Sequence, residues 1–181
     1  MNAQTTETQQ TAAAGDSLPQ FYRNPVPLDP ARHAKAGLKE REDFSFARGT
    51  NAIAITGAEF APVARSYPIV FSATAPVVPF AVVGLRDNEN LFLDLQGRWR
   101  EESYIPAYVR RYPFIFFEIA DSSRLVLCVD EAAESFDRES PQPFFDPDGK
   151  PAAGVQRVLR FSETYQAQFE DTRLFGEWLD K

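Results

Sequence analysis

The chain has 181 residues, of which 44% are hydrophobic and 13% are aromatic, and it carries a formal net charge of -7. This length suits one domain, and a chain this apolar can bury enough surface to offset the entropy lost on ordering. The negative charge argues against nucleic acid and anionic lipid as partners, because their phosphate groups repel an acidic protein surface.

The chain is expected to divide into a tail and one folded domain. Residues 1–17 are mostly Thr, Gln, Ala and Gly with scattered acids, a composition typical of a disordered tail. Residues 18–181 contain most of the aromatic and β-branched residues. We therefore predict a single α+β domain over residues 18–181.

The start of this domain is rich in proline, which favours extended and turn conformations. Asp29 and Pro30 predict the beginning of a short helix that continues through Ala36. Phe44 and Phe46 alternate with polar neighbours, a pattern that indicates either a short strand or a clamp onto the core. The prolines of this segment are Pro19, Pro25, Pro27 and Pro30.

The middle of the chain reads as a series of short apolar strands separated by turns. Ala58–Ser66 is predicted to form one or two helical turns, and Tyr104–Arg111 a short helix with Pro106 in its first turn. The last two strands flank a polar turn at residues 121–123, which predicts two buried strands around it. The strands are expected at residues 52–56, 68–72, 77–85, 91–95, 114–119 and 124–129.

From about Ala152 the apolar residues recur at helical spacing. This pattern predicts one long amphipathic helix that reaches to near Leu179 and is weakened by Gly176. Strands first and a long helix last indicate an α+β fold with a mainly antiparallel or mixed sheet and short helices. Short connections between the strands favour hairpins over crossovers.

Few residues offer catalytic or metal-binding chemistry. Cys128 lies within an apolar run, so we predict a buried thiol, and His33 lies in a polar segment expected to be exposed. One histidine and one cysteine cannot fill a zinc site, and Asp146–Gly149 lacks the following Glu of a calcium loop. The sequence therefore predicts no metal site and no cofactor.

A candidate ligand site lies near the end of the last strand. Asp130 and Glu131 form a carboxylate pair there, and Tyr108 and Arg110 could converge on them beside the buried strands. Trp99 could act as a stacking platform or as a lid on the core. The alternative for the two acids is that they leave the core for solvent, as strand ends commonly do.

No segment of the sequence reads as a transmembrane span. The longest apolar stretch, residues 73–85, contains two prolines and a glycine and is too short to cross a bilayer. The first 20 residues lack the cationic start and apolar core of a secretory signal. These features predict a cytoplasmic protein.

The most specific motif is Tyr-Ile-Pro-Ala-Tyr-Val-Arg-Arg-Tyr-Pro-Phe at residues 104–114. Weaker pieces accompany it at residues 21–28, 67–71, 82–85, 90–92, 99, 128–130 and 145–150. Together these segments resemble the bacterial SapC family, from about residue 18 to the end. That family is named for a protein linked to a surface-layer system and is distinct from the peptide-transporter permease of the same name.

The resemblance implies an accessory role in surface-layer assembly or export, or in the handling of envelope components. It brings no catalytic residues with it, and it implies a surface-layer or envelope component as partner, with surface association of the protein. Family members usually continue past the point where this sequence stops. We therefore expect either that the last helix is cut short here or that this member lacks the last subdomain. In both cases the apolar face of the helix would lack a partner, which would favour homo-oligomerisation through that helix.

Two functions follow as hypotheses. The first is a non-enzymatic accessory or binding protein of the surface-layer system. The alternative is a small-ligand sensor or an uncharacterised enzyme with its site near Tyr108, Arg110, Asp130 and Glu131.

Overall fold

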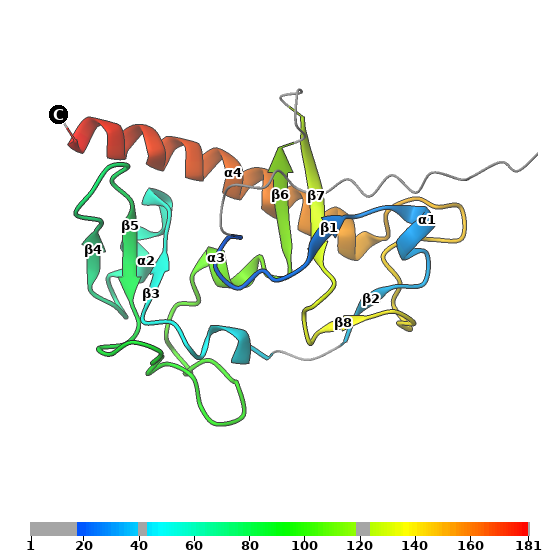
Figure 1. Ribbon diagram of the computed structural model, residues 1–181, viewed down its shortest axis with the longest axis horizontal. Coiled ribbons are helices and arrows are strands. Elements are labelled where there is room, and N and C mark those ends of the chain that lie inside the picture. The colour runs from blue at the N-terminus through cyan, green and yellow to red at the C-terminus, as the bar shows by residue number, and fades with distance from the viewer. Residues whose placement is uncertain (1–17, 40–42, 119–123, 181) are drawn as a thin grey trace, which may run out of the picture.

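The computed structural model describes residues 18–39, 43–118 and 124–180. It contains three small antiparallel sheets, several short helices and one long C-terminal helix (Figure 1). The predicted α+β class is therefore confirmed. The predicted tail at residues 1–17 and the predicted turn at residues 121–123 lie outside the described residues.

The central sheet has the strand order β1-β7-β6. Strands β6 (Phe114–Glu118) and β7 (Leu125–Asp130) are the two strands predicted around the polar turn, and they pair with Ile115 opposite Cys128. On the other side of β7 lies β1 (Pro25–Pro27), in which Val26 pairs with Val129. Proline is tolerated in β1 because this strand is at the sheet edge, where a missing N–H costs little.

A second sheet has the order β3-β5-β4, and a third joins two very short strands. The strands predicted at residues 52–56, 68–72 and 77–85 are present but shorter. The prediction of a strand at residues 91–95 is wrong: only Leu93 makes a bridge, to Trp99, because turns occupy this region. The strands are β3 (Ala52–Ala54), β5 (Pro79–Val82), β4 (Ile69–Phe71), β2 (Gly37–Leu38) and β8 (Phe136–Asp137).

The short helices are close to the predicted positions. The Asp29 carboxylate accepts a hydrogen bond from the backbone N–H of Ala31 at 2.6 Å and so caps α1. A 3-10 helix, and not a strand, follows Phe44, and both Phe44 and Phe46 pack against the core as a clamp. The helices are α1 (Pro30–His33), η1 (Ser45–Ala47), η2 (Gly57–Glu59), α2 (Phe60–Val63), α3 (Ala107–Arg110) and α4 (Ala153–Leu179).

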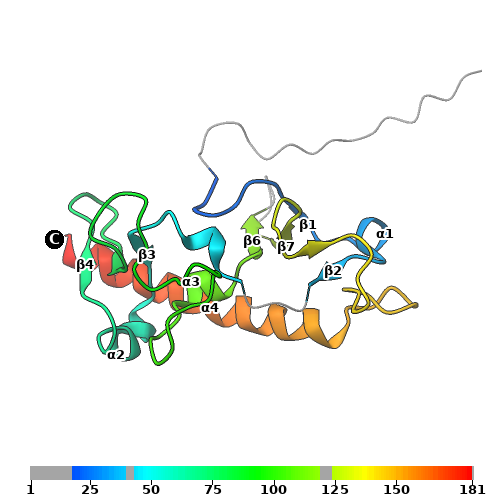
Figure 2. The same cartoon turned by 90° about the horizontal axis from the view of Figure 1, so that it is seen from below.

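Helix α4 runs along most of the folded body, with its C-terminal end beside the hairpin of β4 and β5 (Figures 1 and 2). It contributes Tyr165 to a hydrophobic cluster around β3 and β5, and Val155 to a second cluster around β6 and β7. No helix in residues 18–39, 43–118 and 124–180 has the length and hydropathy needed to cross a membrane.

Gly176 has a specific packing role in α4. A Cβ atom at this position would collide with the backbone carbonyl oxygen of Val77, in the connection between β4 and β5. The glycine that weakens the helix on propensity grounds therefore allows the close approach of α4 to this hairpin.

Candidate functional site

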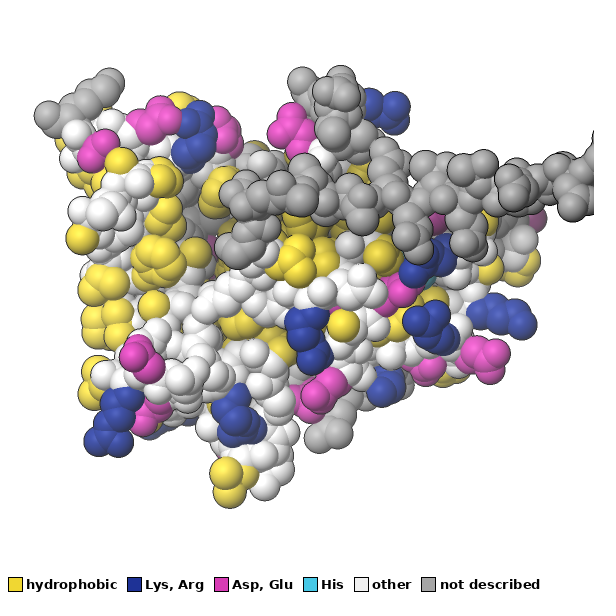
Figure 3. Space-filling model, in the orientation of Figure 1, with side chains coloured by type: hydrophobic (Ala, Val, Ile, Leu, Met, Phe, Trp, Pro, Cys, Tyr) yellow, Lys and Arg dark blue, Asp and Glu magenta, His cyan; other side chains and the backbone are white. Residues whose placement is uncertain are grey.

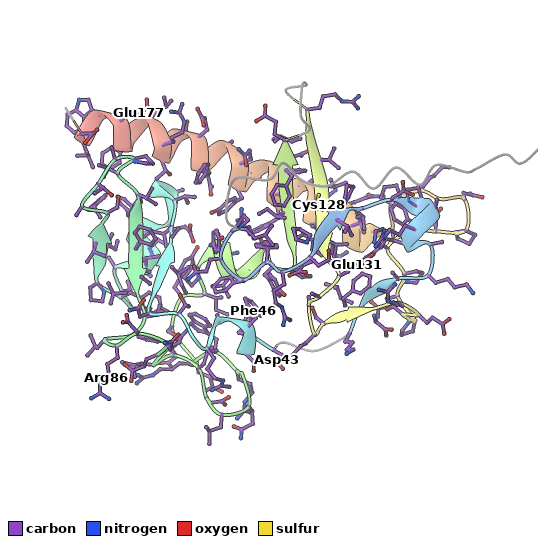
Figure 4. The ribbon with its side chains drawn as sticks, viewed as in Figure 1. Asp43, Phe46, Arg86, Cys128, Glu131 and Glu177 are labelled. Carbon is purple, nitrogen blue, oxygen red and sulfur yellow. The ribbon has the colours of Figure 1, made fainter. Side chains whose placement is uncertain are left out.

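A cavity of about 740 Å³ is lined by four segments that are far apart in the sequence. The segments are the N-terminal stretch before β1, the residues around η1 together with Lys39, the connection from α3 to β6 with Tyr112, and the connection from β7 to β8. Asp43 and Phe46, labelled in Figure 4, come from the second of these. This volume is within the range of small-ligand pockets. Its lining residues are Gln20, Phe21, Tyr22, Arg23, Lys39, Asp43, Ser45, Phe46, Gly49, Thr50, Tyr112, Glu134 and Ser135.

Four aromatic residues line this cavity, Phe21, Tyr22, Phe46 and Tyr112, and their rings pack against one another. The ring centroids of Phe46 and Tyr112 are 4.2 Å apart, and those of Phe21 and Phe46 are 5.1 Å apart. Phe21 has a φ of 80°, a left-handed conformation that a bulky residue rarely adopts. Such a backbone costs on the order of 1–3 kcal/mol and is found preferentially at functional sites. Packing of its ring in the aromatic cluster offsets this cost.

Charges of both signs surround the aromatic rings. The Arg23 guanidinium donates to the backbone carbonyl of Ala132 at 2.6 Å, and the Lys39 ammonium donates to that of Glu134 at 2.8 Å. The carboxylate of Asp43 accepts a backbone hydrogen bond at 2.8 Å. The cavity therefore combines an apolar interior with cations and carboxylates, an arrangement suited to a ligand that has both apolar and charged or amide groups.

Asp130 holds one wall of the cavity in place. Its side chain is fully buried and accepts hydrogen bonds from the backbone N–H groups of Arg23 at 3.0 Å and Asn24 at 2.9 Å. It also accepts from the backbone of Ala132 at 3.0 Å and from the Tyr112 hydroxyl at 3.2 Å. Burial, and then the negative charge of Asp130, raise the pKa of Tyr112, so its phenol remains a donor. Asp130 thus fixes the backbone beside Phe21.

Glu131 belongs to a separate buried network with His33. The prediction that His33 is exposed is wrong: its ring is 1% exposed, because α1 packs it against Phe136. The ring Nδ1 lies 3.1 Å from the N–H of Asp29, and Nε2 lies 3.1 Å from the Glu131 carboxylate. Both ring nitrogens are engaged, so His33 is not a free base.

Arg32 completes this network. Its guanidinium donates two hydrogen bonds to the Glu131 carboxylate, at 2.6 and 2.9 Å, and this interaction lowers the pKa of Glu131. The Glu131 side chain is 4% exposed, so neither it nor Asp130 leaves the core for solvent.

The other residues proposed from the sequence lie in further networks. The Tyr108 hydroxyl donates to the carbonyl of Gln20 at 3.2 Å. The Arg110 guanidinium donates to the Tyr104 hydroxyl at 3.0 Å and lines a small cavity of about 170 Å³. Trp99 is 7% exposed. Of the two roles predicted for it, stacking platform or lid on the core, its burial fits the lid.

The arginines of this segment pack on rings. Arg111 lies 4.2 Å from the centroid of the Tyr108 ring, and Arg110 lies 5.3 Å from that of Phe161. The five residues proposed from the sequence therefore belong to separate networks. Two of these networks reach the 740 Å³ cavity: that of Asp130 through Tyr112, and that of Tyr108 through Gln20.

Sequence reasoning missed the residues that line this cavity. The alternation at Phe44 and Phe46 indicated a clamp, which was the one usable signal for the aromatic interior. The left-handed backbone of Phe21 leaves no trace in the sequence, and Tyr112 is 66 residues away from Phe46 along the chain.

No curated protein and no solved structure matches this chain. A family model described as SapC matches residues 28–181. The matched part includes Phe46 and Tyr112 of the cavity, the residues 104–114 that carry the most specific motif, and all of α4. The chain belongs to the SapC family.

Proposed function

We propose that this chain is a non-enzymatic accessory protein that binds a segment of a protein partner in the 740 Å³ cavity. The observation that carries the proposal is the combination of the Phe21, Phe46 and Tyr112 rings with charges of both signs around them. The resemblance to SapC implies that the partner is a surface-layer or envelope component. The role would be to hold that component during assembly or export.

The arrangement of the cavity supports a peptide segment as the ligand. An aromatic interior can hold one apolar side chain, which gives affinity through burial. The exposed Lys39 ammonium has three donors, so beside its bond to Glu134 it can also pair with a carbonyl or carboxylate that flanks such a side chain in a peptide. The polar side chains of Asp130, Glu131 and His33 already bond within the fold, and this favours binding over acid–base chemistry.

A titration with purified surface-layer subunit from the same organism tests this function. We expect saturable binding by the full chain, weakened about tenfold or more by Phe46→Ala, as for an anchor residue at an interface. Lys39→Glu reverses an exposed charge at the cavity and is expected to weaken binding without unfolding the chain. Leu95→Ala, at a side chain 89% exposed, is the matched control.

The outcomes separate the proposal from its alternative. Subunit binding that is unchanged in both cavity variants would place the interaction elsewhere and overturn the assignment of the cavity. If the subunit does not bind but a metabolite raises the melting temperature, the small-ligand sensor becomes the better description. Cytoplasmic location is part of the proposal, and cell fractionation tests it.

A further inference from the structure

Strand β4 is the outer strand of its sheet and presents unpaired backbone groups at its free edge. The backbone N–H of Val82 bonds to the carbonyl of Pro68, and the N–H of Ser72 bonds to the carbonyl of Val78. Successive residues of a strand direct their backbone N–H and C=O groups to alternate sides. Pro68 and Ser72 direct theirs toward β5, so the N–H and C=O groups of Ile69 and Phe71 point away from β5. Within the described residues no strand pairs with this edge.

This edge lacks the charges that usually protect such strands. Residues 66–85 contain no Asp, Glu, Lys, Arg or His, although the chain as a whole has a net charge of -7. Val70 and Phe71 are each 44% exposed. Soluble proteins normally protect an outer strand with charged side chains, bulges or a covering element. We therefore expect another polypeptide segment to cover this uncharged, partly apolar edge of β4 when the protein functions.

The apolar surface continues from this edge onto the end of α4. The Phe60 ring lies 6.1 Å from that of Phe71 and 6.3 Å from that of Phe175, measured between centroids. Phe175 in turn stacks on Trp178, which is 67% exposed. Hydrophobic side chains gather at this end of the molecule in Figure 3, where β4 and β5 lie in Figure 1.

The size of this surface suits an interface. The exposed parts of Phe71, Phe175, Trp178 and Leu179 amount to roughly 400 Å² of apolar area, taking about 150–250 Å² for each fully exposed large apolar side chain. A standard interface buries about 800 Å² on each partner, a little over half of it apolar. The patch thus supplies most of the apolar area that one side of such an interface needs.

We propose that a second copy of this chain pairs with β4, antiparallel, across a two-fold axis at Val70. The outward groups belong to Ile69 and Phe71, which are placed symmetrically about Val70. In this register Ile69 exchanges two hydrogen bonds with the partner's Phe71, and Phe71 exchanges two with the partner's Ile69. Val70 then faces the partner's Val70 in the closely spaced, non-hydrogen-bonded position.

Self-complementarity is the reason for assigning a second copy. A two-fold interface uses one surface twice, so that surface must match itself. An uncharged edge meets this condition without bringing like charges together, and the symmetric hydrogen-bonding pattern provides four backbone bonds. Pairing joins the two copies of the sheet into one six-stranded sheet, built from twice the order β3-β5-β4.

Sedimentation of the full chain, with cysteine cross-linking, tests this pairing. We expect the native chain to sediment as a dimer and Val70→Glu, which places two carboxylates face to face, as a monomer. Val70→Thr keeps the β-branched shape and should remain a dimer. Val70→Cys should form a reducible cross-linked dimer, because Cα atoms in this position lie about 4.5 Å apart, within disulfide range.

Leu85→Cys is the matched control for cross-linking, because this side chain is 84% exposed and lies outside β4. The native cysteine, Cys128, is buried and should not contribute. A native chain that is monomeric at the highest soluble concentration would overturn the proposal. So would a dimer that survives Val70→Glu, or Val70→Cys cross-linking no faster than Leu85→Cys. Circular dichroism of each variant confirms that it is folded.

Discussion

The hydroxyl of Tyr112 lies 3.2 Å from the fully buried carboxylate of Asp130, to which it donates a hydrogen bond. Tyr112 follows α3, and Asp130 ends β7, so this bond joins two elements that meet at the candidate cavity. The same carboxylate also fixes the backbone of Arg23 and Asn24. One buried negative charge therefore organises both the sheet and a wall of the cavity.

Replacement of this charge is expected to destabilise the fold. In Asp130→Asn one of the acceptor oxygens becomes an amide that cannot accept, and buried donors lose their partner. We expect the free energy of unfolding to fall by about 3 kcal/mol, measured by urea denaturation. Glu139→Gln, at an exposed position in the following loop, should change it by less than about 0.5 kcal/mol. Equal effects of the two substitutions would contradict the structural role of Asp130.

Two glycines of α4 should respond in opposite directions to substitution by alanine. Alanine is the better helix former by about 1 kcal/mol, and at Gly154 an added Cβ meets only the end of the Arg157 side chain at 4.0 Å. Gly154→Ala should therefore be neutral or stabilising. Gly176→Ala forces a methyl group into the Val77 carbonyl and should destabilise by about 1–3 kcal/mol. Thermal unfolding measures both, and a stabilising Gly176→Ala would show that α4 does not pack closely here.

Glu131 should make stability depend on acid pH. The hydrogen bond from Arg32 holds the pKa of Glu131 below its ordinary value near 4.5, so the folded state binds fewer protons than the unfolded state in this range. Stability from this group is complete above the ordinary pKa and is lost as the pH falls through the folded pKa. Glu131→Gln should therefore flatten the acid limb of a stability–pH curve. Glu163→Gln, at an exposed position of α4, is the matched control for the loss of one carboxylate charge.

Cys128 should be unreactive in the native protein. Burial raises the pKa of its thiol to about 11, so little thiolate forms near neutral pH, and access is blocked. We expect a thiol reagent to label the chain at a measurable rate only after addition of urea. Equal labelling rates in buffer and in urea would place the thiol at the surface. Because the folded pKa exceeds the unfolded one, this group should also reduce stability as the pH rises above 9.

The parts of the fold predicted from sequence are those set by local patterns. Helical spacing located α4 to within a residue at its start, and the apolar run around Cys128 located β7 and its burial. Asp29 and Pro30 correctly marked the beginning of α1. In each of these cases the residues that decide the structure are neighbours in the chain.

The parts that were missed depend on contacts between distant segments. Strand β1 exists because its residues pair with β7, about 100 positions later, and a proline-rich segment gives no sign of this. His33 is buried because Glu131 provides a partner for its ring. The cavity likewise brings together Phe21, Phe46 and Tyr112, whose approach no local pattern encodes.

Helix α4 contributes side chains to two hydrophobic clusters, Tyr165 to one and Val155 to the other. Neither of these two hydrophobic clusters is complete without this helix. A fragment that ends before Ala153 would leave both clusters open to water on the side from which α4 is removed. We expect such a fragment to be insoluble, because apolar side chains of both clusters would then be in contact with water.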